Sequence, residues 1–428
     1  MWVSFVAMQF RRGAMALLVV TAALLMPGIA APALAAAPTG LPHYDHVFVL
    51  IEENESIDAT YGAASPATYL KALAKQGAFA DQYFGTGHQS LDNYIAMVSG
   101  QPDNIPVTGA DCLAYNLYTC VQAQSAFASG RNLGDQLDAV GATWVGYMDG
   151  TTAPCQHASY SPAATPPDSW QGNGKTPTPA GQDYADRHNP FLYFPDIIGA
   201  DARCQAHVRP YTELATAISN NVLPQFGFIT PDTCHDGHDS PCSTGGTGNR
   251  TGGLVSANAW LASNLPPLLS YLQTHNGLLL ITDDEGNFPN DNTGCCTGGP
   301  GGTAGFGGRV GLIALGPGVK AGQTVHTSYD HASLLRTIEG LFGITEHLNN
   351  AATATPMTDL FGVSGATATP TPSAGGGTQV AGGGGLPGTT RAIPPTAPIG
   401  AGLGLLAASA AAAAFGLRKR LSKPRADR

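Results

Sequence analysis

Short apolar runs, each bounded by polar or turn-forming residues, recur through the middle of the chain and are typical of strands buried on both faces of a sheet. They predict strands at His46–Ile51, Thr143–Met148, Phe226–Thr230, Gly277–Thr282 and Val310–Leu315. Longer segments around these runs predict helices at Pro66–Gln76, Leu91–Val98, Leu133–Val140, Val255–Thr274 and His331–Phe342. Because buried strands and helices alternate, we expect an α/β fold with a mainly parallel central sheet flanked by helices.

The first 35 residues have the organisation of a secretory signal peptide. Arg11 and Arg12 form a basic start, residues 14–31 form an apolar core, and Ala33-Leu34-Ala35 is a small-x-small cleavage signal. We therefore expect export with cleavage after Ala35, and a globular domain at residues 41–362 that lies outside the cell. The alternative for the first segment is a retained N-terminal helix.

The C-terminal end predicts a tether. Residues 363–397 are rich in Gly, Pro, Thr and Ala, which is typical of a flexible stalk. Residues 398–417 carry no charge, and twenty residues are enough for a helix to cross about 30 Å of hydrocarbon. The basic residues of 418–428 should then stay in the cytoplasm. Leu386–Thr390 reads LPGTT and differs from the sortase signal LPxTG only at its last residue, so wall attachment by a sortase is the alternative to a plain membrane anchor.

The charge balance excludes one class of partner. The chain has 20 Lys and Arg against 30 Asp and Glu, and between residues 36 and 417 the formal charge is −17. A surface this acidic repels phosphate backbones, so we expect no nucleic-acid partner. An acidic protein can still act on phosphate esters if metal ions supply positive charge locally.

The eight cysteines all follow the predicted signal peptide, and none of them forms a CxxC pair. This favours disulfides over a zinc site. Cys112/Cys120 and Cys234/Cys242 are close enough in sequence to form local bridges, although spacing does not determine the connectivity.

Polar residues follow the predicted strands, and ligands of open parallel sheets bind beyond the carboxyl ends of the strands. The four polar groups are Glu52-Glu53-Asn54, Asp232 to Asp239, Asp283-Asp284-Glu285 and Tyr329-Asp330-His331. Taken singly, a carboxylate after a strand is often only a helix N-cap. Taken together, four clusters of oxygen and imidazole ligands suggest one metal centre.

A candidate nucleophile lies at the start of the predicted helix Leu91–Val98. Ser90 is at the position of an N-cap, which is its ordinary structural interpretation. A hydroxyl at a helix N-terminus also suits phosphoryl transfer, because the helix dipole and free N–H groups favour an incoming phosphate. A metal ion can hold such a hydroxyl as its alkoxide, and Asn93 could donate to a phosphoryl oxygen.

Five motifs that occur in order resemble those of the bacterial phosphoesterase family, which includes acid phosphatases and phospholipases C within the alkaline phosphatase-like superfamily. They are ENxSxD from Glu53, GHxSxxNY from Gly87, PDxCxDGHD from Pro231, TxDEG from Thr282 and YDHASLLRTIEGLFG from Tyr329. The resemblance covers residues 44–345. It departs from the family where Glu55 replaces a usual His, where Gln89 and Asp92 replace prolines, and where Asp283 replaces an aromatic residue.

The resemblance implies a metal-dependent phosphoric ester hydrolase with its metal site at the carboxyl ends of the strands. It implies that Ser90 is the nucleophile and that Asn54 and Asn93 contact the phosphate. The implied ligands of one or two divalent metal ions are Glu53, Asp232, Asp236, His238, Asp284, Glu285 and His331. Two alternatives stay open for the pair of ligands that follows the predicted strand Gly277–Thr282, namely Asp283-Asp284 and Asp284-Glu285.

Sequence motifs of other hydrolases are absent, namely CxPxR, GxSxG and GxxxxGK followed by Ser or Thr. We therefore expect a cell-surface, acid phosphatase-like enzyme whose substrate is a phosphate ester. One alternative is a phospholipase C-type phosphodiesterase that cleaves a diester. The other is a non-catalytic surface protein that only binds.

Overall fold

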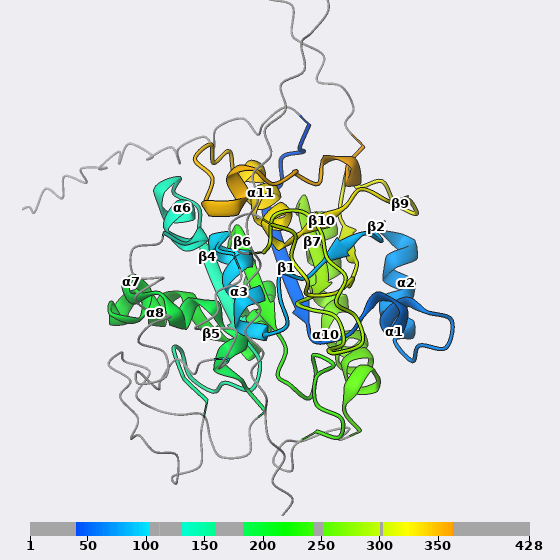
Figure 1. Ribbon diagram of the computed structural model, residues 1–428. Helices are drawn as coiled ribbons and strands as arrows, with labels where there is room; N and C mark the ends of the chain where they lie inside the picture. Colours follow the sequence, from blue (N-terminus) through cyan, green and yellow to red (C-terminus); the bar gives the residue numbers. More distant parts are fainter. Residues whose placement is uncertain are drawn as a thin grey trace, which may run out of the picture. The chain divides into compact units, whose positions relative to one another are not determined.

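Five neighbouring parallel strands, counted from one edge, make up most of the main sheet (Figure 1). The computed structural model describes residues 40–102, 111, 131–158, 183–242, 251–299 and 303–362, and these contain an eight-stranded sheet with the order β5-β4-β6-β1-β7-β8-β2-β9. Its strands are β1 His46–Glu52, β2 Ala78–Ala80, β4 Trp144–Met148, β5 Val208–Pro210, β6 Phe226–Thr230, β7 Gly277–Asp283, β8 Leu312–Leu315 and β9 Thr324–Val325. Strands β5, β4, β6, β1 and β7 run parallel, and β8 is antiparallel to both its neighbours. The expected mainly parallel sheet is confirmed.

All five predicted strands are present, with small differences at their ends. β1 and β7 each run one residue further than predicted, to Glu52 and Asp283. β8 begins at Leu312, two residues later than predicted, because the N–H groups of Val310 and Gly311 donate to the carbonyl of Tyr83 at 2.9 and 3.2 Å. The short strands β2, β5 and β9 escaped prediction, since two or three residues carry no readable period.

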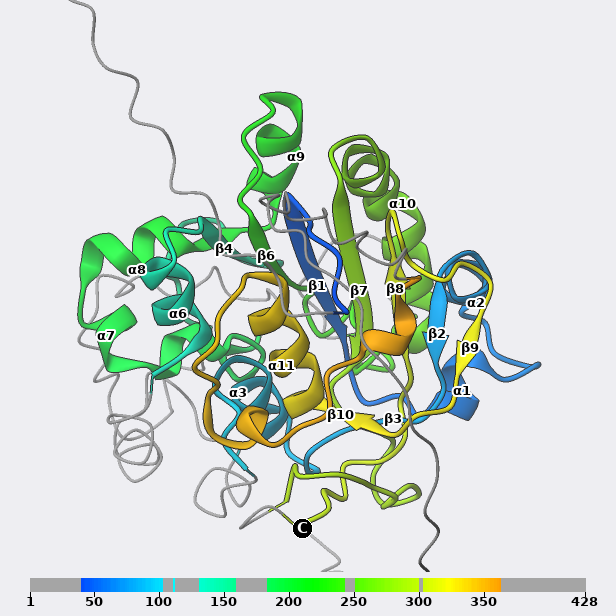
Figure 2. The same ribbon diagram turned by 90° about the horizontal axis from the view of Figure 1, so that it is seen from above.

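Alternate residues of β1 face two different layers of helices. Val47, Val49 and Ile51 pack in one core with α3, α6 and α11, whereas Phe48 and Leu50 pack in a second core with α2, α9 and α10. Figure 2 shows α3, α6 and α11 grouped on one side of the strands, with α2 and α10 on the other. The bounds are α2 Thr68–Gln76, α3 Ser90–Ser99, α6 Leu133–Ala139, α9 Thr212–Ser219, α10 Gly253–Thr274 and α11 His331–Leu341.

Short elements connect these layers and carry several polar residues to the sheet edge. They are α1 Ile57–Tyr61, α7 Pro195–Ile198, α8 Asp201–His207, the 3-10 turns Asp186–His188, Pro190–Tyr193, Asn349–Ala352 and Thr358–Leu360, and the parallel strand pair β3 Tyr83–Phe84 and β10 Tyr329–Asp330. One correction concerns α3. Gln89 is its N-cap, so Ser90 is the first helical residue and does not cap the helix.

Helix α11 carries a fully buried carboxyl group, Glu339, away from the sheet edge. Its Oε1 accepts hydrogen bonds from Gln136 Nε2 at 3.0 Å and from the N–H of Leu348 at 2.9 Å, and its Oε2 lies 2.7 Å from His347 Nδ1. Burial raises the pKa of Glu339 to about 7. The native state therefore holds this proton more tightly than the unfolded chain does.

We expect Glu339→Gln to flatten the pH dependence of the free energy of unfolding. A raised carboxyl pKa stabilises the wild type at pH values below the unfolded pKa, near 4.5, and this contribution is lost as the pH rises through about 7. The difference in free energy of unfolding between wild type and variant should change by about 3 kcal/mol between pH 4.5 and 8.5. Urea unfolding across this range measures it, with the exposed Asp45→Asn as the matched control. An unchanged difference would show that Glu339 does not titrate in this range.

Three disulfides lie within the described residues: Cys155–Cys204, Cys234–Cys242 and Cys295–Cys296. The predicted bridge Cys234–Cys242 is thus confirmed, while Cys112 and Cys120 lie outside the described residues. The predicted signal peptide (1–35), stalk (363–397), apolar segment (398–417) and basic tail (418–428) also lie outside them. Among the helices that are described, none is both long and apolar enough to cross a bilayer.

Candidate active site and metal centre

Backbone hydrogen bonds hold three loops together at the carboxyl edge of the sheet. The parallel register pairs Glu52 of β1 with Asp283 of β7, and the N–H of Asp284 donates to the carbonyl of Glu52 at 3.0 Å. The N–H of Glu53 donates in turn to the carbonyl of Asp236, in the loop after β6, at 2.8 Å. Residues that are about 180 and 230 positions apart in the chain therefore meet at one edge.

Glu53, His188 and Asp236 form a buried cluster at this edge. His188 Nε2 lies 2.6 Å from Glu53 Oε2, and His188 Nδ1 lies 3.3 Å from Asp236 Oδ2. All three residues are at most 1% exposed. The ring of Tyr94, from α3, stacks on the His188 ring with centroids 5.2 Å apart and covers the cluster from one side.

The electrostatics of this cluster call for a cation. Burial lowers the pKa of His188 well below its ordinary value, so the imidazole is neutral and cannot form an ion pair with either carboxylate. Both Glu53 oxygens, both His188 nitrogens and Asp236 Oδ2 are buried without a hydrogen-bond partner. Unpartnered carboxylate oxygens and a neutral imidazole nitrogen are the donor atoms that a divalent metal ion takes. The three residues, which together could hold such an ion, fit the expected metal centre.

Asp284 borders the same cluster. Its Oδ1 accepts hydrogen bonds from the N–H groups of Asn54, at 3.2 Å, and Glu285, at 2.6 Å, while its Oδ2 is buried without a partner. Burial raises the pKa of Asp284 well above its ordinary value, and the neighbouring Glu53 adds to the shift. Asn54 contributes through its backbone, with a φ of 60°. Asp284 thus presents one free oxygen beside Glu53.

The two candidate ligand pairs that follow β7, Asp283-Asp284 and Asp284-Glu285, differ in the direction of their side chains. Leu279 and Ile281 of β7 belong to the α10 core, and by strand alternation Asp283 points to the same side. Burial raises the pKa of the Tyr61 hydroxyl, and Asp283, which lies near it, adds to this shift. Glu285 instead accepts a hydrogen bond from Asn93 Nδ2 at 2.8 Å, on the α3 side. This arrangement favours Asp284 and Glu285 as the pair that faces α3.

Ser90 lies in the first turn of α3, next to residues that touch both ends of the site. The side chain is 4% exposed, and its hydroxyl makes no hydrogen bond to a described residue. Asn93, one turn on, bonds Glu285, and Tyr94 covers His188. The N–H of Leu91 donates to Asp111 Oδ1 at 3.1 Å. The N-terminal part of α3 therefore borders the buried carboxylates of the site.

The side chain of Asn93 is fully used within the protein. Its Oδ1 accepts hydrogen bonds from the N–H groups of Thr86, at 2.7 Å, and Gly87, at 3.3 Å. Its Nδ2 donates to the carbonyls of Gly87 and Gln89 as well as to Glu285. This pattern holds the loop before Ser90 and the Glu285 carboxylate in fixed positions. A direct contact of Asn93 with phosphate stays a prediction that requires some of these bonds to be exchanged.

Two further residues predicted as metal ligands, His331 and His238, lie outside the Glu53–His188–Asp236 cluster. His331 is buried with Nδ1 2.9 Å from the Tyr83 hydroxyl and Nε2 2.6 Å from the carbonyl of Asp284, so both nitrogens are engaged. His238 bonds Asp239 Oδ1 at 2.8 Å, and its ring lies 6.1 Å from that of His188. Their bonds suit positioning roles in this arrangement, with His331 holding the Asp284 backbone.

Asp232 belongs to a second group with Asp149 and His235. His235 Nδ1 lies 2.8 Å from Asp149 Oδ2 and 2.9 Å from Asp232 Oδ1. Burial opposes the charged form of His235, but the bonds to the two carboxylates outweigh it and raise its pKa to about 10. An imidazolium between two carboxylates is satisfied without a metal ion.

The sequence analysis missed His188. The residue comes from the long polar segment 149–192, which follows β4, and not from the end of a predicted strand. In the sequence, His188 stands between Arg187 and Asn189-Pro190. Such a pattern is common in surface loops and gives no sign of a metal ligand. Only the packing of the 3-10 turn Asp186–His188 against α3 reveals it.

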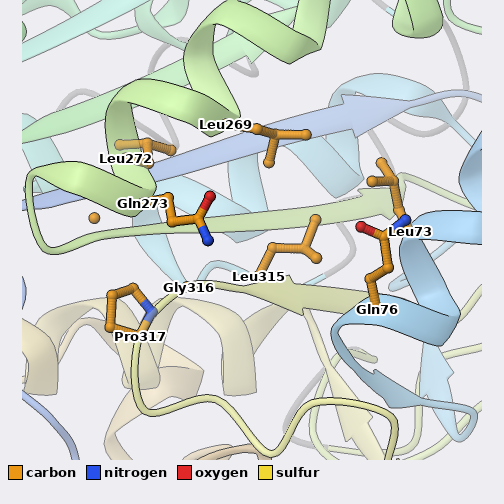
Figure 3. Close-up of a pocket in the computed structure, with 9 residues that line it drawn as sticks. Leu73, Gln76, Leu269, Leu272, Gln273, Leu315, Gly316 and Pro317 are labelled. Carbon is orange, nitrogen blue, oxygen red and sulfur yellow. The ribbon is translucent and has the colours of Figure 1, made fainter.

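A different cavity of about 460 Å³ opens at the opposite edge of the sheet (Figure 3). Leu73, Leu269, Leu272 and Leu315 line it between α2 and α10, close to Gly277 where β7 begins. Because the candidate site follows the other end of β7, this apolar cavity is not part of it.

A parallel sheet that places buried carboxylates and a neutral imidazole beside a helix N-terminus is suited to metal-assisted hydrolysis of an anionic ester. Comparison with known proteins identifies this class more closely. The chain belongs to the Phosphoesterase family, whose family model matches residues 63–345, and it is a phosphoric ester hydrolase.

The curated relatives carry phosphatase names. The phosphatidylinositol-3-phosphatase of Mycobacterium tuberculosis is 25% identical over 345 residues, which cover 80% of this chain and 92% of that protein. A probable acid phosphatase of Kluyveromyces lactis is 27% identical over 302 residues, covering 69% of this chain and 58% of that protein. The chain thus spans nearly all of the first relative and little more than half of the second.

Solved structures with a similar fold include members of the alkaline phosphatase superfamily. A protein of that superfamily from Vibrio parahaemolyticus matches with a TM-score of 0.46 and 10% identity, over 74% of this chain and 71% of that one. Murine ectonucleotide pyrophosphatase/phosphodiesterase 5 matches with a TM-score of 0.44 and 12% identity, over 74% of this chain and all of that one.

Proposed function

We propose that the protein is a metal-dependent phosphomonoesterase that uses Ser90 as its nucleophile. The observation that carries the proposal is the first turn of α3. It contains Ser90, while Asn93 and Tyr94 of the same helix contact Glu285 and His188 of the buried site. The phosphatase names of the curated relatives support a monoester as the substrate class.

The reaction that this arrangement suits has two steps. The Ser90 oxygen forms a bond to phosphorus as the bond from phosphorus to the alcohol oxygen breaks, and the proton that the Ser90 hydroxyl loses is balanced by the one that the departing alcohol oxygen takes up. Water then hydrolyses the phosphoserine and returns the Ser90 hydroxyl. A divalent ion bound at the site would supply positive charge to the Ser90 oxygen and to the phosphoryl group.

Some residues of the chain are proposed to bind the metal ion, and others position them. Glu53, His188, Asp236 and the free oxygen of Asp284 are the proposed metal ligands, because their donor atoms are buried and unpartnered. His331 positions Asp284 through its backbone carbonyl, and Asn93 positions Glu285. The α3 N-terminus faces the phosphate with the positive end of its dipole.

Export and tethering form the second part of the proposal. The signal-peptide pattern of residues 1–35 and the three disulfides support an oxidising compartment outside the cytoplasm. The apolar segment 398–417 with its basic flank supports a membrane anchor, with a sortase as the alternative. External protease on intact cells should then release an active soluble fragment.

A substrate panel tests the proposed activity. The metal-loaded protein is expected to release phosphate from p-nitrophenyl phosphate, and to be slower on bis(p-nitrophenyl) phosphate and phosphatidylcholine. The Ser90→Ala variant, prepared in the same way, controls for contaminating phosphatases. Faster turnover of the diesters would assign a phosphodiesterase instead. If the metal-loaded protein hydrolysed none of these esters, it would be assigned as a non-catalytic protein that only binds.

A further inference from the structure

Two phenylalanine side chains remain exposed beside the candidate site. Phe288 is 64% exposed and Phe306 is 38% exposed. Both rings pack on the same imidazole, that of His88, with centroid distances of 5.1 and 6.1 Å. His88 itself is only 8% exposed. The Phe288–Phe306 pair thus covers His88 and leaves its outer faces in solvent, where two aromatic rings cost free energy unless a ligand covers them.

Hydrogen bonds connect this pair to the loop that carries Ser90. The N–H of Phe306 donates to the carbonyl of Thr86 at 3.1 Å, and the N–H of Thr86 donates to Asn93 Oδ1 at 2.7 Å. His88 stands two residues before Ser90, and its Nδ1 lies 3.8 Å from Glu285 Oε1. Phe288 follows Glu285 by three residues. The pair is therefore continuous with the site and is not an isolated surface feature.

The pocket that adjoins the pair offers little to an anionic alcohol. In the adjoining pocket that Phe84 and Asn287 help to line, the one cationic side chain, Arg309, already lies 3.7 Å from Asp58. Negative charge on the alcohol would therefore find no cation without a carboxylate neighbour among the described residues that line this pocket, whereas an apolar group would meet two aromatic faces.

We propose that the Phe288–Phe306 pair binds the alcohol side of the substrate and selects phosphate esters whose alcohol is aromatic or otherwise apolar. The inference rests on the proposed phosphomonoesterase activity and adds a substrate class to it. The rings stack against or pack along the apolar group, while the phosphate enters between α3 and the buried carboxylates.

The test compares two monoesters on the metal-loaded protein, 2-naphthyl phosphate and glycerol 1-phosphate. Phe306→Ala and Phe288→Ala should each lower kcat/KM for naphthyl phosphate about tenfold, the effect of leaving about 50 Å² of apolar surface in water. The value for glycerol phosphate should change less than about twofold, because that ester has no apolar group to lose contact. Val222→Ala is the matched control, since Val222 is 66% exposed and precedes β6 at the opposite edge of the sheet.

An equal loss on both esters in the two variants would overturn the inference and assign the rings a structural role. Unchanged kinetics on both esters would also overturn it. If the two variants instead lost only their co-sedimentation with phosphatidylcholine vesicles, the inference would be overturned and the rings would be assigned to a membrane surface. These outcomes differ from a failure of the proposed function, in which the wild-type protein hydrolyses neither ester.

Discussion

Replacement of Ser90 by alanine is expected to lower kcat by about 10³- to 10⁶-fold, the range found when an enzyme loses a nucleophile that acts with its partners as a unit. The serine hydroxyl makes no hydrogen bond to a described residue, and alanine is the best helix former. We therefore expect the variant to fold with a melting temperature close to that of the wild type. Steady-state kinetics on p-nitrophenyl phosphate and thermal unfolding measure the two quantities.

Ser99 provides the matched control at the other end of the same helix. Its hydroxyl donates to the carbonyl of Ile95 at 2.8 Å, and the residue is fully buried. Ser99→Ala should therefore lower the free energy of unfolding by about 1 kcal/mol and leave kcat near the wild-type value. If Ser90→Ala retained activity within tenfold of the wild type, Ser90 would not be the nucleophile.

Removal of divalent metal is expected to abolish hydrolysis and to lower the melting temperature. Without a cation, Glu53, Asp236 and Asp284 are buried carboxylates in close proximity, and they must repel one another or bind protons. An ion at 100 times its Kd stabilises the native state by about 2.7 kcal/mol, and this is lost on chelation. Kinetics and thermal unfolding before and after chelation, with readdition of a divalent ion, measure both effects.

A histidine variant tests the metal assignment at one residue. His188→Ala removes a proposed ligand and should raise the metal concentration needed for half-maximal activity by more than about tenfold. His207→Ala is the control, because His207 stacks on Trp144 with centroids 3.9 Å apart, at the other end of the strands. Full activity after exhaustive chelation, with elemental analysis confirming that no metal remains, would refute the metal centre.

Much of the site could be read from the sequence because parallel strands end at one edge. Glu53 and Asp284 directly follow β1 and β7, so their positions after two apolar runs were enough to predict that both lie at the carboxyl edge of the sheet. The order of the strands was not readable. β6 lies next to β1 and brings Asp236 to Glu53, whereas the carboxylate Asp232 of the same loop joins His235 instead.

The sequence by itself determined the alternation of buried strands and helices, the acidic balance of charge, and the carboxylates and serine that we propose as the reactive groups. Periodicity and residue type are local properties, so they are visible in a single chain. Only the tertiary structure decided which of these groups meet. His188 contacts Glu53 from an irregular segment that has no hydrophobic periodicity. His331 forms hydrogen bonds with Tyr83 and the Asp284 carbonyl. Such contacts depend on how loops pack over the sheet edge, and side-chain burial there is set by residues that are distant in the sequence.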